Sequence, residues 1–485
     1  MRIVMLGWEF PPFIAGGLGT ACFGLTRALD RAGHEIVFVL PRPVNDALAT
    51  HVRLLSPPDL PRTLRQPAGA LDPALVGPEF AALAGSLGPV PFPFAHTTLI
   101  GVPAGFRSPY PGGGAVAGRA RPRIVRQGLF QGEADVELTD DDEVDAVVSA
   151  PATTRTTHGF GTTGPGAGYQ GDLFADADRY ARLVVALLRG QRFDVIHAHD
   201  WLTFPAGMAL ARVTGRPLIT HIHSTEFDRS GEHVNQRVYD VERRGMMAAM
   251  RIICVSELTK SICTRRYGVS GDRVDVVYNG VDNESHQPLP GSRVSSKDKI
   301  VLFLGRITMQ KGPEYFIAAA KRVLERVPEA KFIMAGSGDM ELRMIELAAN
   351  LGIGHRVLFT GFLRGPDVDR VYRMADCYVM PSVSEPFGIA PLEAIRNDVP
   401  VIISRQSGVS EVLTHCLKVD FWDIDEMANK IIAVLRHPPL GQTMRSHSGF
   451  ELRRLTWDGA ASKCAESYGR ALALAGAHER PAHSL

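Results

Sequence analysis

Short apolar runs alternate with helical patterns along most of this 485-residue chain, and this alternation restricts the fold more than any other feature. Residues 2–6 form the first run, residues 20–32 have apolar side chains at helical spacing, and residues 35–40 form the second run. Strands that are apolar throughout, with helices between them, are typical of parallel sheets covered on both faces. Similar runs follow at residues 194–197, 217–221, 251–255 and 274–277. We therefore predict an α/β fold.

A second series of such units begins after the polar stretch at residues 288–299. Its first helix is predicted over residues 313–327, and its strands at residues 300–304, 331–335, 357–360, 376–380 and 401–404. The two series predict two Rossmann-like domains that face each other across a cleft, at residues 1–290 and 296–455. Residues 456–485 are expected to form a short tail and a helix, over 457–474, that packs back onto the first domain.

Between residues 43 and 171 the pattern weakens, and Pro, Gly and Ala become frequent. A basic patch at residues 119–126 precedes an acidic run at residues 133–143. We interpret this stretch as a long, irregular insertion in the first domain, and the acidic run as a solvated loop instead of a metal site.

Composition excludes several classes of protein. With 45% hydrophobic and 22% charged residues and a net charge of +1, the chain is typical of a globular protein, and its charge predicts no nucleic-acid partner. Its six cysteines form no CxxC pair, which favours a reducing compartment. We find no stretch long and apolar enough for a transmembrane helix, and we interpret residues 2–6 as a core strand instead of a signal peptide, so we expect a cytoplasmic protein.

A glycine-rich turn, Gly16-Gly17-Leu18-Gly19, follows the first predicted strand and precedes a helix. Glycines allow close approach of the backbone to a ligand, and a helix N-terminus favours an anion. A dinucleotide fingerprint is the rival interpretation. It fails because Cys22 occupies the place of the third glycine and Pro41-Arg42 follows the second strand where a ribose-binding acid would stand.

Two histidines and an aspartate stand at the end of another strand, in the sequence His197-Ala198-His199-Asp200. We expect one histidine to face the cleft and the other to face the packing layer. The set could suggest a metal, but residues two apart on a strand are a poor clamp, and we predict no metal site. Because His221 and His223 end the next strand, we expect a polar site on this rim.

Two loops of the second domain carry charges suited to phosphates and hydroxyls. Arg306 and Lys311 lie five residues apart in a loop before a helix, which suits a diphosphate. Glu385 and Glu393 flank a strand-to-helix turn that contains Gly388. Carboxylates bind sugar and ribose hydroxyls, but two of them could also be the acid and the nucleophile of a glycosidase, and their spacing leaves both uses open.

Taken together, five motifs resemble the retaining glycosyltransferases of the GT-B fold, in particular the glycogen/starch synthases and the family-four transferases. The motifs are Gly16-Gly17-Leu18-Gly19, His197-Ala198-His199-Asp200-Trp201, Asn279-Gly280-Val281-Asp282, the loop from Gly305-Arg306 to Lys311-Gly312, and the pair Glu385 and Glu393. The resemblance covers about residues 1–42 and 177–470. It implies a nucleotide-sugar donor, ADP- or UDP-linked, a saccharide acceptor, no further cofactor and no essential metal.

The resemblance also implies roles for residues of the second domain. Arg306 and Lys311 would grip the diphosphate, Glu385 would contact hydroxyls of the donor sugar, and Glu393 would bind the ribose. The sugar and part of the phosphate would be held by the backbone of Phe387, Gly388 and Ile389.

In the first domain, the resemblance implies that Gly16 and Gly17 approach the diphosphate and that His199 contacts the donor sugar near the reacting carbon. The expected reaction is transfer of glucose with retention of the anomeric configuration. Domain closure would exclude water from the donor.

Two departures from the family pattern affect the choice of substrate. Ile14 stands where bacterial glycogen synthases usually carry a lysine, and the insertion at 43–171 is longer than a simple family-four enzyme would have. A family-four transferase with a lipid-linked or small-molecule acceptor is therefore an alternative, and the basic patch at 119–126 would suit a membrane surface. An NAD-dependent oxidoreductase and a non-enzymatic sugar-nucleotide-binding protein are the remaining interpretations.

Overall fold

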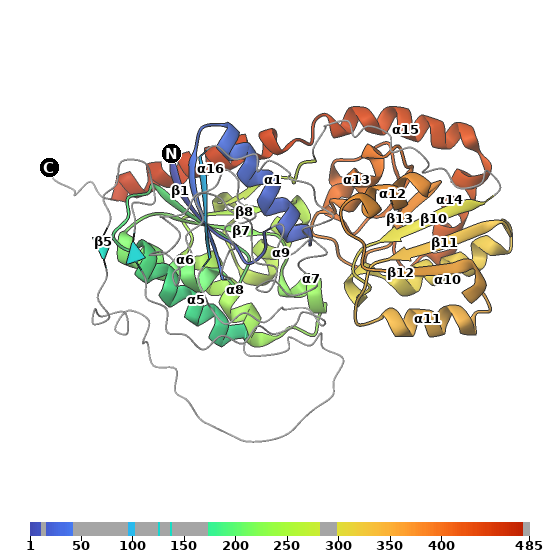
Figure 1. Cartoon of the computed structure of the whole chain (residues 1–485), viewed down its shortest axis with the longest axis horizontal. Coiled ribbons are helices and arrows are strands. Elements are labelled where there is room, and N and C mark those ends of the chain that lie inside the picture. Colours follow the sequence, from blue (N-terminus) through green and yellow to red (C-terminus); the bar gives the residue numbers. More distant parts are fainter. Residues whose placement is uncertain are drawn as a thin grey trace, which may run out of the picture.

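The computed structural model describes residues 1–10, 16–41, 96–101, 125–126, 136–137, 173–281 and 298–478. Two parallel sheets organise these residues, and Figure 1 shows them as two lobes. The predicted α/β class with two Rossmann-like domains is confirmed. Ile14, Asp282 and most of the insertion, with most of its basic patch and acidic run, lie outside the described residues.

The first sheet has the strand order β3-β2-β1-β6-β7-β8-β9, and each neighbouring pair is parallel. Its strands are β1 (Arg2–Leu6), β2 (Glu35–Leu40), β3 (Thr97–Gly101), β6 (Val195–His199), β7 (Leu218–Ile222), β8 (Arg251–Cys254) and β9 (Val274–Val276). The helices of this domain are α1 (Gly17–Arg31), α5 (Leu173–Leu188), α6 (Phe204–Thr214), α7 (Glu226–Ser230), α8 (Gln236–Ala248) and α9 (Glu257–Tyr267), with a 3-10 turn η3 (Gly271–Arg273). A separate antiparallel pair consists of β4 (Val125–Arg126) and β5 (Val136–Glu137).

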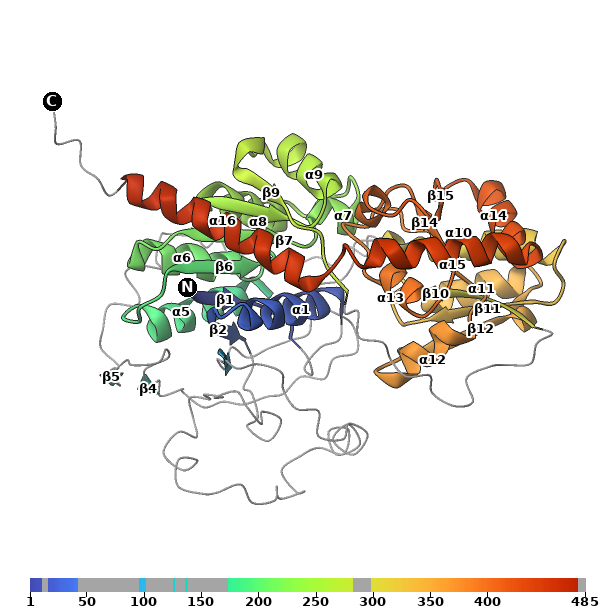
Figure 2. The same ribbon diagram turned by 90° about the horizontal axis from the view of Figure 1, so that it is seen from above.

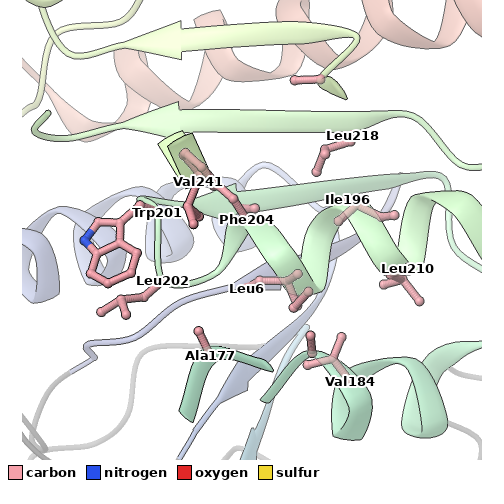
Figure 3. Close-up of a cluster of buried hydrophobic side chains, with 14 of the residues drawn as sticks. Leu6, Ala177, Val184, Ile196, Trp201, Leu202, Phe204, Leu210, Leu218 and Val241 are labelled. Atoms are coloured by element: carbon pink, nitrogen blue, oxygen red, sulfur yellow. The ribbon is translucent and has the colours of Figure 1, made fainter. Parts of the chain in front are cut away.

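Alternating side chains of the first sheet pack into two hydrophobic cores, one on each face. Val4 and Leu6 of β1 pack with α5, α6 and α8, whereas Ile3 and Met5 pack on the opposite face with α1. Figure 3 shows the first of these cores, in which Leu6, Ile196 and Leu218 of the strands lie near Phe204 and Leu210 of α6 and Ala177 and Val184 of α5. Both faces are therefore covered, which explains why the strands are apolar throughout.

The second sheet has the strand order β12-β11-β10-β13-β14-β15 and is also parallel. Its strands are β10 (Lys299–Leu304), β11 (Ala330–Ala335), β12 (Val357–Gly361), β13 (Cys377–Met380), β14 (Val401–Ser404) and β15 (Leu417–Val419). Its helices are α10 (Pro313–Leu324), α11 (Glu341–Asn350), α12 (Pro366–Met374), α13 (Ala390–Arg396), α14 (Ile424–Arg436) and α15 (Pro438–Leu452), with 3-10 turns η4 (Met309–Lys311), η5 (Gly354–Arg356) and η6 (Gly408–Glu411).

The last helix, α16 (Trp457–His478), returns to the first domain. Figure 2 shows it beside α1, and its residues Trp457, Cys464 and Tyr468 are buried in the core below α1. A Cβ on Gly24 of α1 would lie 2.2 Å from the Trp457 ring, so only glycine allows this approach. Where the chain re-enters the first domain, Val281 forms an isolated parallel bridge with Thr456.

Most observed boundaries lie within a few residues of the expected ones. β1 and β2 coincide with the runs at residues 2–6 and 35–40, but α1 begins at Gly17 instead of residue 20, and β6 continues to His199. The glycine-rich turn is thus partly the first turn of a helix. None of the helices in the described parts of the chain is long and apolar enough to cross a lipid bilayer.

Candidate active site

The predicted site residues lie at the carboxyl ends of strands or in the loops and helix starts that follow them, where ligands bind in doubly wound sheets. Hydrogen bonds between the two domains show that they are in contact on this side. Ser384 Oγ donates to Asp228 Oδ1 over 2.6 Å, and Ser256 Oγ donates to the Pro386 carbonyl over 2.5 Å. The structure therefore brings the loop that carries Glu385 against the first domain.

Gly16 and Gly17 form the N-terminus of α1. Gly16 is the N-cap residue, and its carbonyl accepts a hydrogen bond of 3.0 Å from the Thr20 amide. A Cβ on Gly16 would lie 2.9 Å from a carboxylate oxygen of Glu9, at the end of a flexible side chain, whereas a Cβ on Gly17 would meet no atom of the described residues within 4 Å. A larger residue at Gly16 would therefore displace the Glu9 side chain, and the first-turn amides of α1 are donors of the kind that bind an anion.

His197 and His199 lie on the same face of the first sheet, so the expectation that they face opposite sides is wrong. Side chains two residues apart on a strand share a face, and the two rings stack with centroids 4.2 Å apart. His221 and His223 stack in the same way, 4.1 Å apart. Because His199 is opposite His221 on the neighbouring strand, the four rings form one group, which we call the histidine cluster.

Hydrogen bonds connect the histidine cluster into two chains. His199 Nδ1 lies 2.9 Å from His223 Nε2. His197 Nε2 lies 3.1 Å from His221 Nδ1, and its Nδ1 lies 2.6 Å from the hydroxyl of Tyr468 on α16. The Nε2 atoms of His199 and His221 are buried and have no hydrogen-bond partner within the described residues. His199 Nε2 is therefore available to a ligand.

Burial keeps these imidazoles neutral. Desolvation lowers the pKa of His197 and of His223 to about 3, and it holds the pKa of His199 and of His221 well below the ordinary value. A neutral ring carries one N–H and one lone pair, so His199 can exchange a hydrogen bond with a hydroxyl group. Burial also raises the pKa of the neighbouring Asp200 to about 7.

The two predicted cations have different surroundings. Arg306 is exposed in the loop after β10, whereas Lys311 ends η4 and its Nζ lies 2.5 Å from Glu385 Oε2. Gly312, with φ +63°, follows Lys311 and caps α10, and a Cβ there would lie 2.2 Å from the Pro381 carbonyl oxygen. This tight turn fixes Lys311 at the N-terminus of α10, beside Glu385.

The turn after β13 positions Glu385 and the backbone that follows it. Glu385 is 7% exposed, and its carboxylate also accepts a hydrogen bond of 3.3 Å from Ser382 Oγ. The Phe387 side chain is buried beside the Tyr278 ring, so a ligand could reach only its backbone. Gly388 has φ +105°, a conformation that favours glycine.

Beyond this turn, Ile389 is the N-cap residue of α13, and Glu393 lies in the first turn of that helix. The Tyr372 hydroxyl donates to Glu393 over 3.2 Å. Burial raises the pKa of Glu393, although the Arg396 charge and the Tyr372 hydrogen bond oppose this effect. A polar ligand that displaced water here would find a carboxylate already oriented by a hydroxyl group.

Two interdomain residues did not stand out in the sequence. Asp228 could have been recognised as part of a helix start, because Thr225-x-x-Asp228 is a capping-box pattern and both of its hydrogen bonds are present. Glu411 accepts hydrogen bonds from the amides of Glu257 and Leu258 at the N-terminus of α9. No sequence pattern indicates that Glu411 caps a helix of the other domain.

Three family models match successive parts of the chain. The starch synthase catalytic domain model matches residues 2–60, the Glycosyltransferase Family 4 model matches residues 142–285, and the model of glycosyl transferases group 1 matches residues 289–448. The resemblance expected from the five motifs is therefore confirmed.

Individual relatives agree with these models. Over 244 residues the chain is 36% identical to an uncharacterized glycosyltransferase of Methanocaldococcus jannaschii, an alignment that spans 48% of this chain and 62% of that relative. It is 26% identical to glycogen synthase of Mycobacterium tuberculosis over 86% of this chain and 80% of the relative. Sucrose-phosphate synthase from Thermosynechococcus elongatus has the same fold, with a TM-score of 0.66 and 18% identity over 98% of this chain and 100% of that chain.

Proposed function

We propose that this glycosyltransferase with the GT-B fold moves glucose from an ADP- or UDP-linked donor to a saccharide acceptor with retention of the anomeric configuration. The observation that carries the proposal is the contact of 2.5 Å between Lys311 and Glu385. Lys311 is the residue expected to bind the diphosphate and Glu385 the residue expected to bind the sugar, so the bond to be broken would lie between two adjacent side chains.

Cleavage of the bond between sugar and diphosphate leaves negative charge on the departing phosphate. Lys311 stands directly before α10, and the amides at the start of that helix favour the same charge. Groups fixed before the reaction stabilise the transition state more than the ground state. Arg306, on the exposed part of the loop, would supply a second cation when the donor is bound.

Glu385 and Lys311 would exchange partners on donor binding. In the structure they neutralise each other with side chains that are 9% and 20% exposed. A donor would offer hydroxyls to Glu385 and phosphate oxygens to Lys311, so that neither charge is buried without a partner. The exchange therefore favours a ligand that carries both groups, which is the chemistry of a nucleotide sugar.

His199 and Glu393 would complete the donor site from the two domains. The Nε2 atom of His199, which is neutral and without a hydrogen-bond partner in the described structure, suits a hydroxyl of the donor sugar. Glu393, oriented by Tyr372, suits the ribose hydroxyls. The backbone at Phe387, Gly388 and Ile389 would lie along the sugar and the phosphate, and Gly16 and Gly17 would approach the diphosphate from α1.

A family-four reaction with a lipid-linked or small-molecule acceptor is the second candidate. It is favoured by the Glycosyltransferase Family 4 model over residues 142–285 and by Ile14, which removes a lysine usual in bacterial glycogen synthases. The donor chemistry is the same in both cases, and the difference lies in the acceptor.

The test is nucleotide release from ADP-, UDP- and GDP-glucose, with and without glucan, followed by proton NMR of the new glycosidic bond. We expect release from one donor that increases with an acceptor, and an α-linked product from an α-linked donor. A β-linked product would contradict retention. Donor binding without release, whatever saccharide or lipid-linked acceptor is offered, would favour a non-enzymatic binding protein and contradict the proposal.

A further inference from the structure

The histidine cluster contains more ligating atoms than the proposed transfer reaction uses. Cys22 of α1 lies next to it, fully buried, with its thiol free. Donor atoms of Cys22, His199 and His223 all lie within 4.8 Å of one another, and those of His197, His199 and His221 do so as well. His199 belongs to both triads, and the transfer reaction assigns no role to Cys22, His221 or His223.

The chemistry of these donors suits a transition metal. Imidazole nitrogen and thiolate sulfur are the usual ligands of Zn²⁺, which takes four of them in a tetrahedral site and three in a site open to another ligand. A neutral imidazole binds a cation through a ring lone pair without losing a proton, and here the donor atoms converge from three separate parts of the chain. Burial, and then the nearby carboxylates of Glu9 and Asp200, raise the pKa of the Cys22 thiol, so a thiolate there requires the charge of a bound cation.

Of the two triads, the one with Cys22 is better suited to hold an ion. The thiolate supplies a negative charge that the all-histidine triad lacks, and His223 is only partly buried, which gives a path from the surface. In the other triad, both ring nitrogens of His197 already have partners, Tyr468 and His221. Two histidines at positions i and i+2 of one strand are poorly placed to bind the same ion. The triad with Cys22 avoids this problem because its three residues come from three different parts of the chain.

We propose that Cys22, His199 and His223 form a binding site for a zinc-class divalent ion, and that an ion there blocks His199. The ion-binding part stands alone, and only the blocking part rests on the proposed function. An ion bound to His199 would keep that ring from the donor sugar and would place positive charge beside the sugar. The site therefore makes glycosyl transfer sensitive to free transition metal.

The protons balance without any redox step. Cys22 loses its thiol proton to solvent as the sulfur–metal bond forms. The contact between His199 Nδ1 and His223 Nε2 uses one hydrogen, and each ring can offer the ion a lone pair on one of its two nitrogens. Any hydrogen on a nitrogen that binds the ion moves to the other nitrogen of the same ring, so both imidazoles stay neutral and one proton, that of the thiol, is released per ion.

Cobalt titration of the full chain, without substrates, tests the site directly. We expect one equivalent of Co²⁺ to produce a thiolate-to-cobalt charge-transfer band and the visible bands of a tetrahedral ion, and Zn²⁺ to abolish both. Cys22→Ser should lose the charge-transfer band, and His223→Gln should weaken binding by more than the roughly 10–100-fold cost of losing an outer-shell partner. A wild-type chain without the band, or a Cys22→Ser chain that retains it, overturns the proposal.

Matched controls separate this site from other donors in the described structure. Cys416 is a partly buried thiol of the second domain, and His447 stacks on His415 at its surface. Cys416→Ser and His447→Ala should leave the cobalt spectrum unchanged. If Cys22→Ser fails to fold, the wild-type chain is alkylated in urea below its unfolding midpoint, where local opening exposes the buried Cys22: Zn²⁺ should slow modification of Cys22 more than that of Cys416, and equal effects on the two thiols overturn the proposal.

Inhibition of nucleotide release tests whether the bound ion blocks His199. Zn²⁺ should inhibit nucleotide release by the wild-type chain, a chelator should restore it, and Cys22→Ser should remain active with little inhibition. Equal inhibition of both chains overturns the blocking part. Because the cobalt bands require no substrate, a chain that binds cobalt but releases no nucleotide contradicts only the proposed function.

Discussion

Ser384 of the second domain donates a hydrogen bond of 2.6 Å to Asp228 of the first, so the residue directly before Glu385 is held by the opposite half of the molecule. Asp228 is itself fixed, because its other carboxylate oxygen caps α7 through the amide and hydroxyl of Thr225. The position of Glu385, and with it that of Lys311, therefore depends on the approach of the two domains.

Replacing Ser384 by alanine tests this dependence. A hydrogen bond to a charged group contributes roughly 1.5–3 kcal/mol, so we expect Ser384→Ala to lower kcat/KM by about 10-fold, mainly through kcat. Steady-state nucleotide release measures the change. Ser384→Thr, which keeps the hydroxyl, should restore most of the rate. If alanine and threonine variants are equally impaired, the side chain acts by its size and not through Asp228.

Lys311→Ala removes the cation at the start of α10. We expect the turnover number to fall by about two to three orders of magnitude, the scale of losing one preorganised donor, because the departing phosphate loses its counter-charge. Lys331→Ala is the control, since Lys331 pairs with Asp298 at the surface of the same domain and should leave turnover unchanged. Near-normal turnover of the Lys311 variant would show that another group neutralises the leaving phosphate.

Gly24→Ala tests how α16 is held against α1. The new methyl group would overlap the Trp457 ring, and we expect a loss of about 1–3 kcal/mol in the free energy of unfolding, measured by urea denaturation. Gly469→Ala in α16 is the control, because a Cβ there meets nothing within 4 Å. Alanine is the better helix former, so this control should be neutral or slightly stabilising. Equal effects of the two variants would show that the approach at Gly24 can relax freely.

Asp275 provides a pH-dependent contribution to the docking of α16. Burial alone would raise the pKa of Asp275, but hydrogen bonds from Arg251 and Ser467 and the charges of Arg251 and Arg470 lower it below the ordinary value. A carboxyl group whose pKa is lowered by folding adds to the free energy of unfolding at every pH above its ordinary pKa of about 4. This added stability is lost as the pH falls through the pKa that the group has in the folded protein. We expect Asp275→Asn to cost about 1 kcal/mol at pH 7 after solvent screening.

Urea denaturation of wild type and Asp275→Asn from pH 7 downward measures this contribution. The difference between the two chains should shrink below about pH 4. Asp458→Asn, which removes an exposed ion pair with Arg31, should change stability by less than about 0.5 kcal/mol. A difference for Asp275 that stays constant with pH would mean that packing, not charge, is lost.

The sheets could be predicted from the sequence because their strands are buried on both faces. β1 and β2 were located to the residue, since every position in them is apolar or at a strand end. β15 was missed because Leu417–Val419 has only three residues with a lysine between two apolar ones, a pattern too short to distinguish from a loop. β3 was missed because Thr97–Gly101 lies in a stretch without apolar periodicity.

The positions of Lys311, Glu385 and Glu393 relative to strands and helices could be predicted because strand ends and helix starts are local features. Their contacts could not be predicted in the same way. The pairing of Lys311 with Glu385 joins residues 74 positions apart, and that of Ser384 with Asp228 joins residues 156 positions apart. The expectation that His197 and His199 face opposite sides was wrong because residues two apart on a strand share a face of the sheet. The same rule predicts that the two side chains lie together.

The bridge between Val281 and Thr456 has a mechanical consequence. The polypeptide leaves the first half just after Val281 and comes back to it just before Trp457, and the Val281 amide donates to the Leu455 carbonyl over 2.9 Å at that place. Two points of the chain that are 175 positions apart, Val281 and Thr456, are thus fastened together where the halves join. A chain cut at one place between the halves would remain joined at the other, and removing everything after Leu455 would take away the part of the core around Ile3 and Met5 that α16 supplies.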